Sequence, residues 1–312
     1  MCHASGSRRR GEGRWALAAG MALALLAAPA TAATSAGGGF ERGSEAPATG
    51  APTIPEALLN SLLLLSDDAC EVRYVPGSLD RAAHVEPWLR ELATGAAKRT
   101  RVAAPLVALV LPRDEWQQAR LPCAYGVPCA AGDRVLALPA AGDSGTVALW
   151  RGILGALPAL EGQPLMGTAE EASSLVPADA YGSFLASRDL VRAAGFAADE
   201  PWVTDLLAHA VALDAARQSR SGRGEALAAF WEVVRGQGPP ASRPGAPLLL
   251  AGELFRQARI FLAAQALLGS DGRLPAKVLR KMQEKGSGVL RAADVRASWP
   301  EAMSNVPVPD PM

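Results

Sequence analysis

Residues 201–217 read PWVTDLLAHAVALDAAR, and this stretch decides how the rest of the chain is interpreted. Apolar side chains recur along it at helical spacing, and its proline suits a first helical turn, so it predicts an amphipathic helix that starts at Pro201. Further helices are expected on both sides of this one. They cover residues 177–194, with Gly195 as the C-cap, and residues 225–234, 248–268 and 275–285.

The chain before residue 140 has a different pattern. Three short runs favour strands: CEVRYV at 70–75, LVALVL at 106–111 and RVLAL at 134–138. The helices expected around them lie at residues 55–68, at 79–97 with an interruption near Pro87, at 112–120 and at 146–157. Strands first and helices later predict an α+β fold, with a small N-terminal sheet followed by a helical region in a single domain at residues 55–300.

The first residues have the layout of a secretory signal. Arginines cluster in residues 8–14, an apolar run fills residues 15–28, and Ala30 and Ala32 are the small residues that signal cleavage requires. An uncleaved anchor is the alternative, although the apolar run is short for a membrane span. We therefore expect a signal peptide at 1–32, and no integral membrane segment once it is removed. The mature protein is then periplasmic or secreted.

Composition limits the partners and marks the ends of the folded part. Lys+Arg and Asp+Glu each total 31, so the formal net charge is zero and no basic excess favours nucleic acid. With 49% hydrophobic residues the chain is too apolar to be disordered throughout. A Gly-, Ala- and Pro-rich segment at 33–54 predicts a flexible leader, and a Pro-containing segment at 301–312 predicts a disordered tail.

Three cysteines remain after signal cleavage. Cys123 and Cys129 flank the loop segment Ala-Tyr-Gly-Val-Pro, and an oxidising compartment would favour a local disulfide between them. The alternative is two unpaired loop thiols. Cys70 is left over in either case. No second cysteine pair or nearby histidine completes a tetrahedral zinc site with these thiols.

The order of these segments resembles that of a known family. EVRYVPG is followed by a helix, then by VALVLPRDEW, a loop, DRVLALPA and two core helices, which is similar to the exported metallopeptidase-like domains of the gluzincin (zincin) kind. The most specific match is PWVTDLLA at 201–208, which resembles that family's Trp-Leu-x-Glu-Gly-x-Ala segment. The resemblance covers residues 71–216. It implies a zincin-like fold, and it places Asp205 where the family has the glutamate that is its third zinc ligand.

The catalytic part of the family pattern is missing. Its preceding helix carries His-Glu-x-x-His, in which two imidazoles bind zinc and the glutamate takes a proton from the zinc-bound water. The corresponding segment here, YGSFLASRDLVRAAG at 181–195, contains neither His nor Glu, and Asp205 is one methylene shorter than the family's Glu. We therefore expect a degenerate zincin-like domain with no catalytic residue, no bound metal and no cofactor.

These observations leave three functions open. The first is an exported, non-catalytic member of the metallopeptidase-like group that binds a peptide or protein partner. The second is an active metal-dependent hydrolase with an atypical site made of Asp189, Asp205 and His209, because Asp205 and His209 are one helical turn apart. A simpler interpretation of that pair is a partly buried histidine bonded to Asp205. The third is an unrelated structural or interaction protein with an α+β fold.

Overall fold

Apolar runs that are buried on both faces form the centre of the sheet. A computed structural model describes residues 54–65, 69–158, 167–219, 222–239, 248–271, 289–304 and 306. Its five-stranded sheet has the order β1-β2-β3-β5-β4. The strands are β1 (Leu63–Leu64), β2 (Cys70–Tyr74), β3 (Leu106–Leu111), β4 (Cys129–Gly132) and β5 (Val135–Pro139). The three central strands are parallel, and β1 and β4 pair antiparallel at the two edges.

The central strand β3 contacts two separate hydrophobic clusters. Leu106, Ala108 and Val110 belong to the larger cluster, which the helical region shares. Leu109 and Leu111 face the other side and pack with α1 and α3. Because side chains alternate along a strand, a run that is apolar at every position suits a strand covered on both faces. This explains why LVALVL occupies the middle of the sheet.

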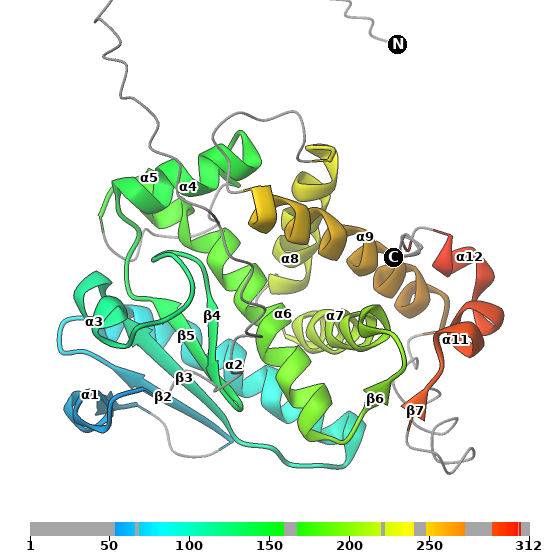
Figure 1. Cartoon of the computed structure of the whole chain (residues 1–312), viewed down its shortest axis with the longest axis horizontal. Coiled ribbons are helices and arrows are strands. Elements are labelled where there is room, and N and C mark those ends of the chain that lie inside the picture. Colours follow the sequence, from blue (N-terminus) through cyan, green and yellow to red (C-terminus); the bar gives the residue numbers. More distant parts are fainter. Residues whose placement is uncertain are drawn as a thin grey trace, which may run out of the picture. The chain divides into compact units, whose positions relative to one another are not determined.

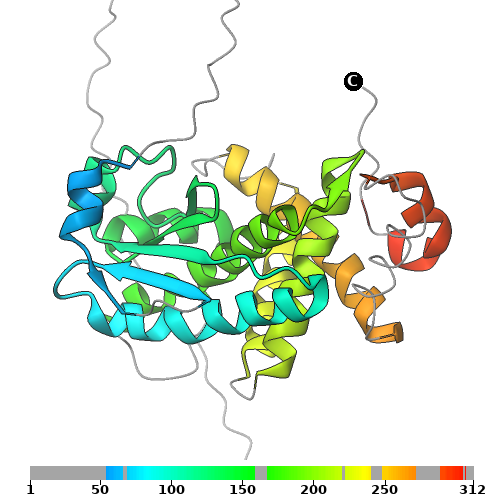
Figure 2. The ribbon, with the colours of Figure 1, turned by 90° about the horizontal axis from the view of Figure 1, so that it is seen from below.

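Helices cover both faces of the sheet and form the second half of the unit (Figures 1 and 2). The helices that surround the sheet are α1 (Glu56–Ser61), α2 (Leu79–Thr100), α3 (Arg113–Gln118), α4 (Ser144–Leu154) and α5 (Ala169–Ser173). The helical region consists of α6 (Leu175–Ala193), α7 (Pro201–Gln218), α8 (Arg223–Gly236), α9 (Leu248–Asp271), α11 (Ala292–Ser298) and α12 (Pro300–Met303). Two short strands, β6 (Ala197–Ala198) and β7 (Val289–Leu290), pair parallel. All these elements lie in one unit, Thr49–Met312.

Helix α7 lies at the centre of the helical region. It packs against α2, α6, α8 and α9, and only Pro201, Thr204, Asp214, Arg217 and Gln218 escape full burial. The predicted helix is therefore correct, but its amphipathic character is wrong, because neighbours surround it on all sides.

Small side chains allow those neighbours to come close to α7. A Cβ atom added at Gly95 of α2 would lie 3.2 Å from the Cβ of Ala215 of α7, which is tight contact. Ala208, Ala210 and Ala212 are likewise buried along α7. Close packing of α2 and α6 against α7 follows from this alanine-rich surface.

The structure bears out the α+β class and the small N-terminal sheet, but several expected boundaries differ. The helix expected at 55–68 ends at Ser61, because Leu63 pairs with Tyr74 and starts β1. Pro87 does not interrupt α2, since buried residues on both sides of it, Val85 and Trp88, hold the helix in place.

The C-terminal boundary also differs from the expected one. Residues 300–303 form α12, and Met303 and Val306 are buried in the larger core, so disorder does not begin at residue 301. The helix expected at 275–285 and the signal at 1–32 lie outside the described residues, as does the leader except Ile54. Within the described residues, no helix has both the length and the apolar character needed to cross a bilayer.

The local disulfide expected from the cysteine spacing is present. Cys123 and Cys129 are bonded, and Cys70 is a free, buried thiol on β2. The bond ties the loop after α3 to the edge strand β4, and Trp116 of α3 donates to the carbonyl of Cys123 at 2.9 Å. The disulfide therefore restrains the loop that joins α3 to β4.

Removing this disulfide should lower stability. Replacing both Cys123 and Cys129 by Ser is expected to lower the free energy of unfolding by about 2 kcal/mol, because the unfolded chain loses a short closed loop. Urea unfolding followed by circular dichroism measures the change. A reductant should lower the stability of the parent protein by a similar amount and leave the double variant unaffected. Equal stability of the two proteins without reductant would contradict the expectation.

Candidate functional site

Asp205 and His209 lie on the same face of α7 and point toward α9. Both side chains are buried, with exposed fractions of 2% and 0%. Helix α9 presents Glu253, Arg256 and Gln257 at helical spacing opposite them. The two faces together form a hydrogen-bonded network inside the helical region, which we call the Asp205 network.

Two guanidinium groups neutralise Asp205. Arg256 donates from Nη2 to Oδ2 of Asp205 at 2.9 Å, and Nε of Arg188 on α6 lies 3.7 Å from the other carboxylate oxygen. Arg256 also bonds Glu253 on its own helix. A buried carboxylate is tolerated only when it is paired and hydrogen-bonded, and Asp205 has both kinds of partner. The position that the family resemblance assigns to a zinc ligand is thus occupied by ion pairs.

Gln257 connects the carboxylate to the imidazole. Its amide nitrogen donates to Asp205 at 2.9 Å and to Glu253 at 2.8 Å, so its amide oxygen is the atom that faces Nε2 of His209, at 2.9 Å. An amide oxygen only accepts, and Nε2 of His209 therefore carries the proton. Nδ1 of His209 is buried, and in the described parts of the chain it has no partner. The direct Asp205–His209 bond considered above is replaced by a bridge through Gln257.

An aromatic shell encloses the imidazole. The ring of His209 stacks on Phe184 of α6, with centroids 4.5 Å apart. The rings of Trp231 and Phe261 are nearly perpendicular to the imidazole, with centroid distances of 5.0 and 5.5 Å. Burial lowers the pKa of His209 to about 3, and the charge of Arg256 acts in the same direction, against the bond to Gln257. The histidine is therefore neutral at ordinary pH.

Asp189 does not join the other two candidates. It is half-buried on α6, and it has no hydrogen bond or ion pair within the described residues. Burial raises the pKa of its carboxyl group, while the charges of Arg192 and Arg188 oppose the change. In the same described residues, no group of three or more His, Cys, Asp and Glu side chains could hold a metal ion. Asp189, Asp205 and His209 are therefore not brought together as a ligand set.

A cavity of about 500 Å³ lies on the other side of α6, between α2, α6, α7 and α8. We call it the four-helix cavity. Its middle is apolar and is formed by Trp88, Leu92, Ala180, Ala212 and Leu227. The volume is typical of pockets that hold small ligands, which occupy about 300–1,000 Å³.

Charged groups also line the four-helix cavity, among them Asp179 and His84. Arg81 forms a two-pronged ion pair with Asp179, with one N–O distance of 2.9 Å, and Nε2 of His84 lies 3.3 Å from the same carboxylate. Burial by itself would raise the pKa of Asp179, but Arg81 and His84 hold it below its usual range. Glu91 and Arg223 line the cavity as well.

Of the residues in the Asp205 network and the four-helix cavity, the sequence pointed only to Asp205 and His209. Gln257 is 48 residues away from His209 in the chain, and its helix shows nothing unusual in sequence. The cavity collects residues from four helices, so only the fold brings them together. One signal was present: α2 carries His84, Trp88 and Glu91 at helical spacing on a single face.

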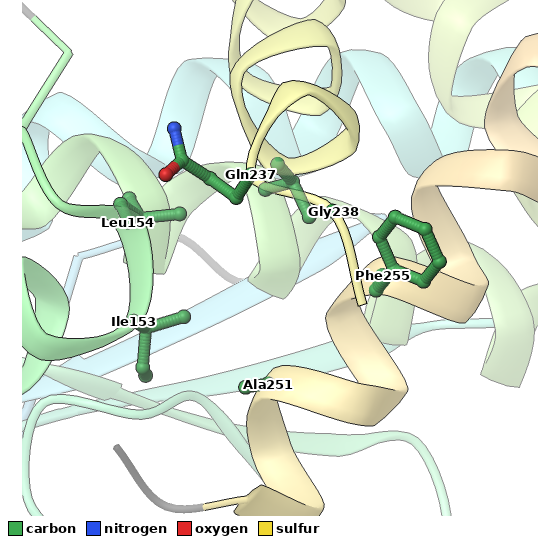
Figure 3. Close-up of a pocket in the computed structure, with 7 residues that line it drawn as sticks. Ile153, Leu154, Gln237, Gly238, Ala251 and Phe255 are labelled. Carbon is green, nitrogen blue, oxygen red and sulfur yellow. The ribbon is translucent and has the colours of Figure 1, made fainter. Parts of the chain in front are cut away.

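A second, much smaller pocket lies between the ends of α4 and α8 and the start of α9 (Figure 3). Its volume is about 20 Å³, roughly the space of a single water molecule. Ile153, Leu154, Ala251 and Phe255 line it, with the amide of Gln237 at its edge (Figure 3). It is a packing defect between helices and has no room for a ligand.

Stability should fall between pH 7 and pH 5 because of His209. The pKa of its imidazole is about 3 in the folded protein against 6.5 ordinarily, so the unfolded chain takes up the proton first as the pH falls. Stability is complete above pH 6.5 and is progressively lost toward pH 3. At pH 5 the loss is about 2 kcal/mol. Urea unfolding at both pH values measures it, and equal losses in the parent protein and in a non-titrating His209→Phe variant would contradict this assignment.

Comparison of the chain with protein-family models, with curated proteins and with solved structures finds no match. The metallopeptidase-like resemblance therefore rests on the residues quoted for it. The Asp205 network and the four-helix cavity are the two features from which a function of this chain is inferred.

Proposed function

We propose that this chain is an exported, non-catalytic protein of metallopeptidase-like architecture that binds a peptide or protein partner. The mixed sheet followed by α6 and α7, which pack side by side, agrees with the order of elements that the resemblance implies (Figure 1). The bonded Cys123–Cys129 pair agrees with an oxidising compartment.

One observation carries the non-catalytic part of the proposal. In the resembled family, the acidic residue on the second core helix binds zinc, and here that residue is Asp205, which binds Arg256 at 2.9 Å. Arg188 stands on α6, the helix on which the family carries its two zinc-binding imidazoles, and lies 3.7 Å from Asp205. Positive side chains therefore supply the charge that a zinc ion would supply, and Oδ2 of this carboxylate already accepts hydrogen bonds from Arg256 and Gln257.

The remaining binding feature is the four-helix cavity. A protein without turnover still needs a concave surface to hold its partner, and pockets of this size with an apolar middle and a few polar groups are the usual form. An active hydrolase built on Asp189, Asp205 and His209 would need these residues around one ion, and their separate environments do not support it.

Metal analysis combined with a substitution tests this proposal. The purified protein should carry no stoichiometric zinc, and a chelator should not change its stability. Asp205→Ala should lower the free energy of unfolding by about 2–3 kcal/mol, because Arg256 and Arg188 lose their shared buried partner. Asp189→Asn is the matched control and should change stability little, because Asp189 has no bonded partner among the described residues.

Two results would contradict the proposal. The first is one zinc ion per chain that is lost on Asp205→Ala. The second is chelator-sensitive peptide hydrolysis by a clean preparation. Either result would favour the atypical metal-dependent hydrolase instead.

A further inference from the structure

The four-helix cavity contains hydrogen-bond donors that have no acceptor. Arg223, the first residue of α8, lies over the ring of Trp88, with its guanidinium carbon 5.0 Å from the ring centroid. Its nearest charged partner is Glu91, at 3.8 Å, beyond hydrogen-bond distance. No hydrogen bond satisfies this guanidinium within the described residues. Its side chain is 30% exposed, so it is accessible from the cavity mouth and partly removed from water.

Trp88 and the start of α8 also line the cavity. Trp88 is 3% exposed, and in the described residues its indole N–H has no acceptor. Helix α8 begins at the cavity with Gly222 as N-cap, which has no side chain to bond the first N–H groups of the helix. The start of a helix carries a partial positive charge that adds to the charge of Arg223. A negatively charged acceptor in front of Arg223 and the start of α8 would therefore be stabilised.

The acceptors of the cavity are, by contrast, already bonded. Arg81 occupies both oxygens of Asp179, and His84 lies 3.3 Å from one of them. Glu91 accepts from Ser219 at 3.1 Å. Glu225 is exposed and is solvated by water. The unmet bonding capacity of the cavity is therefore that of donors, and it points to a ligand that brings an acceptor with negative charge.

The apolar middle defines the rest of the ligand. Ala180, Ala212 and Ala215 leave space where larger residues would fill the gap between α6, α7 and α8. Leu92, Leu227 and the ring of Trp88 provide apolar surface around that space. Such a wall favours an aliphatic or aromatic group next to the acceptor, because apolar burial contributes about 25 cal/mol per Å².

We propose that the four-helix cavity binds a carboxylate attached to an apolar group, as at the C-terminus of a peptide that ends in a hydrophobic residue. The carboxylate bonds Arg223 in two-pronged geometry near the start of α8, and the last side chain fills the alanine-lined middle. The peptide form of this ligand rests on the proposed function, whereas the carboxylate chemistry rests on the cavity alone.

Calorimetric titration of the purified protein with three probes tests the proposal. They are N-acetyl-Ala-Ala-Leu with a free carboxylate, the same peptide with a C-terminal amide, and 4-methylpentanoate. The peptide acid should bind at least about tenfold more tightly than the amide, since the amide cannot form the charge-assisted bonds to Arg223. Arg223→Gln should remove this preference. Arg235→Gln is the matched control, because Arg235 lies on the same helix but pairs with Glu232 away from the cavity.

Two other variants separate binding from folding. Glu91→Gln should tighten binding of the peptide acid several-fold, because it removes a negative charge that competes for Arg223. Ala180→Leu should fill the middle of the cavity and abolish binding of all three probes while the protein stays folded.

Each outcome has a distinct meaning. Equal affinity for acid and amide, or binding unchanged by Arg223→Gln, would overturn the proposal. Binding of 4-methylpentanoate without the peptide acid would support the carboxylate site and reject the peptide source. Cleavage of the bound peptide would contradict the proposed non-catalytic function and leave the carboxylate site standing.

Discussion

The helical region depends on the neutralisation of one buried carboxylate. Helix α7 is enclosed by four other helices, and near its N-terminal end it carries Asp205, 2% exposed. Burying a charge without a partner costs several kcal/mol, and Arg256 and Gln257 of α9 and Arg188 of α6 are the partners that offset this cost. The network thereby fixes how α6, α7 and α9 align.

The buried network and the open cavity lie in different parts of the helical region. Residues near the expected ligand positions, Phe184, Arg188 and Asp205, are used for stacking and ion pairing inside the core. The open, partly polar space lies instead between α2, α6, α7 and α8, where Arg223 and Trp88 meet. The guanidinium of Arg223, which has no hydrogen bond within the described residues, lies in this cavity.

Much of the fold was predictable, because buried strands and helices have recognisable patterns of apolar residues in the sequence. LVALVL is apolar at every position and became the central strand, and the spacing of Cys123 and Cys129 predicted their disulfide. The edge strand β4 was missed, because its sequence CAAG has no β-branched residue. The burial of α7 on all sides was missed too. Its alanines fit either an exposed or a closely packed helix surface, so the sequence does not show that neighbouring helices pack there. Partners such as Gln257 and Arg256 meet Asp205 only through tertiary packing, and no local pattern announces them.

Diffraction from zinc-soaked crystals, recorded on both sides of the zinc absorption edge, tests the central claim most directly. If guanidinium groups take the place of a metal at Asp205, the anomalous map should be empty around this carboxylate and Arg256 should remain at hydrogen-bond distance. An anomalous peak bonded to Asp205, with Arg256 and Arg188 turned away, would contradict the account.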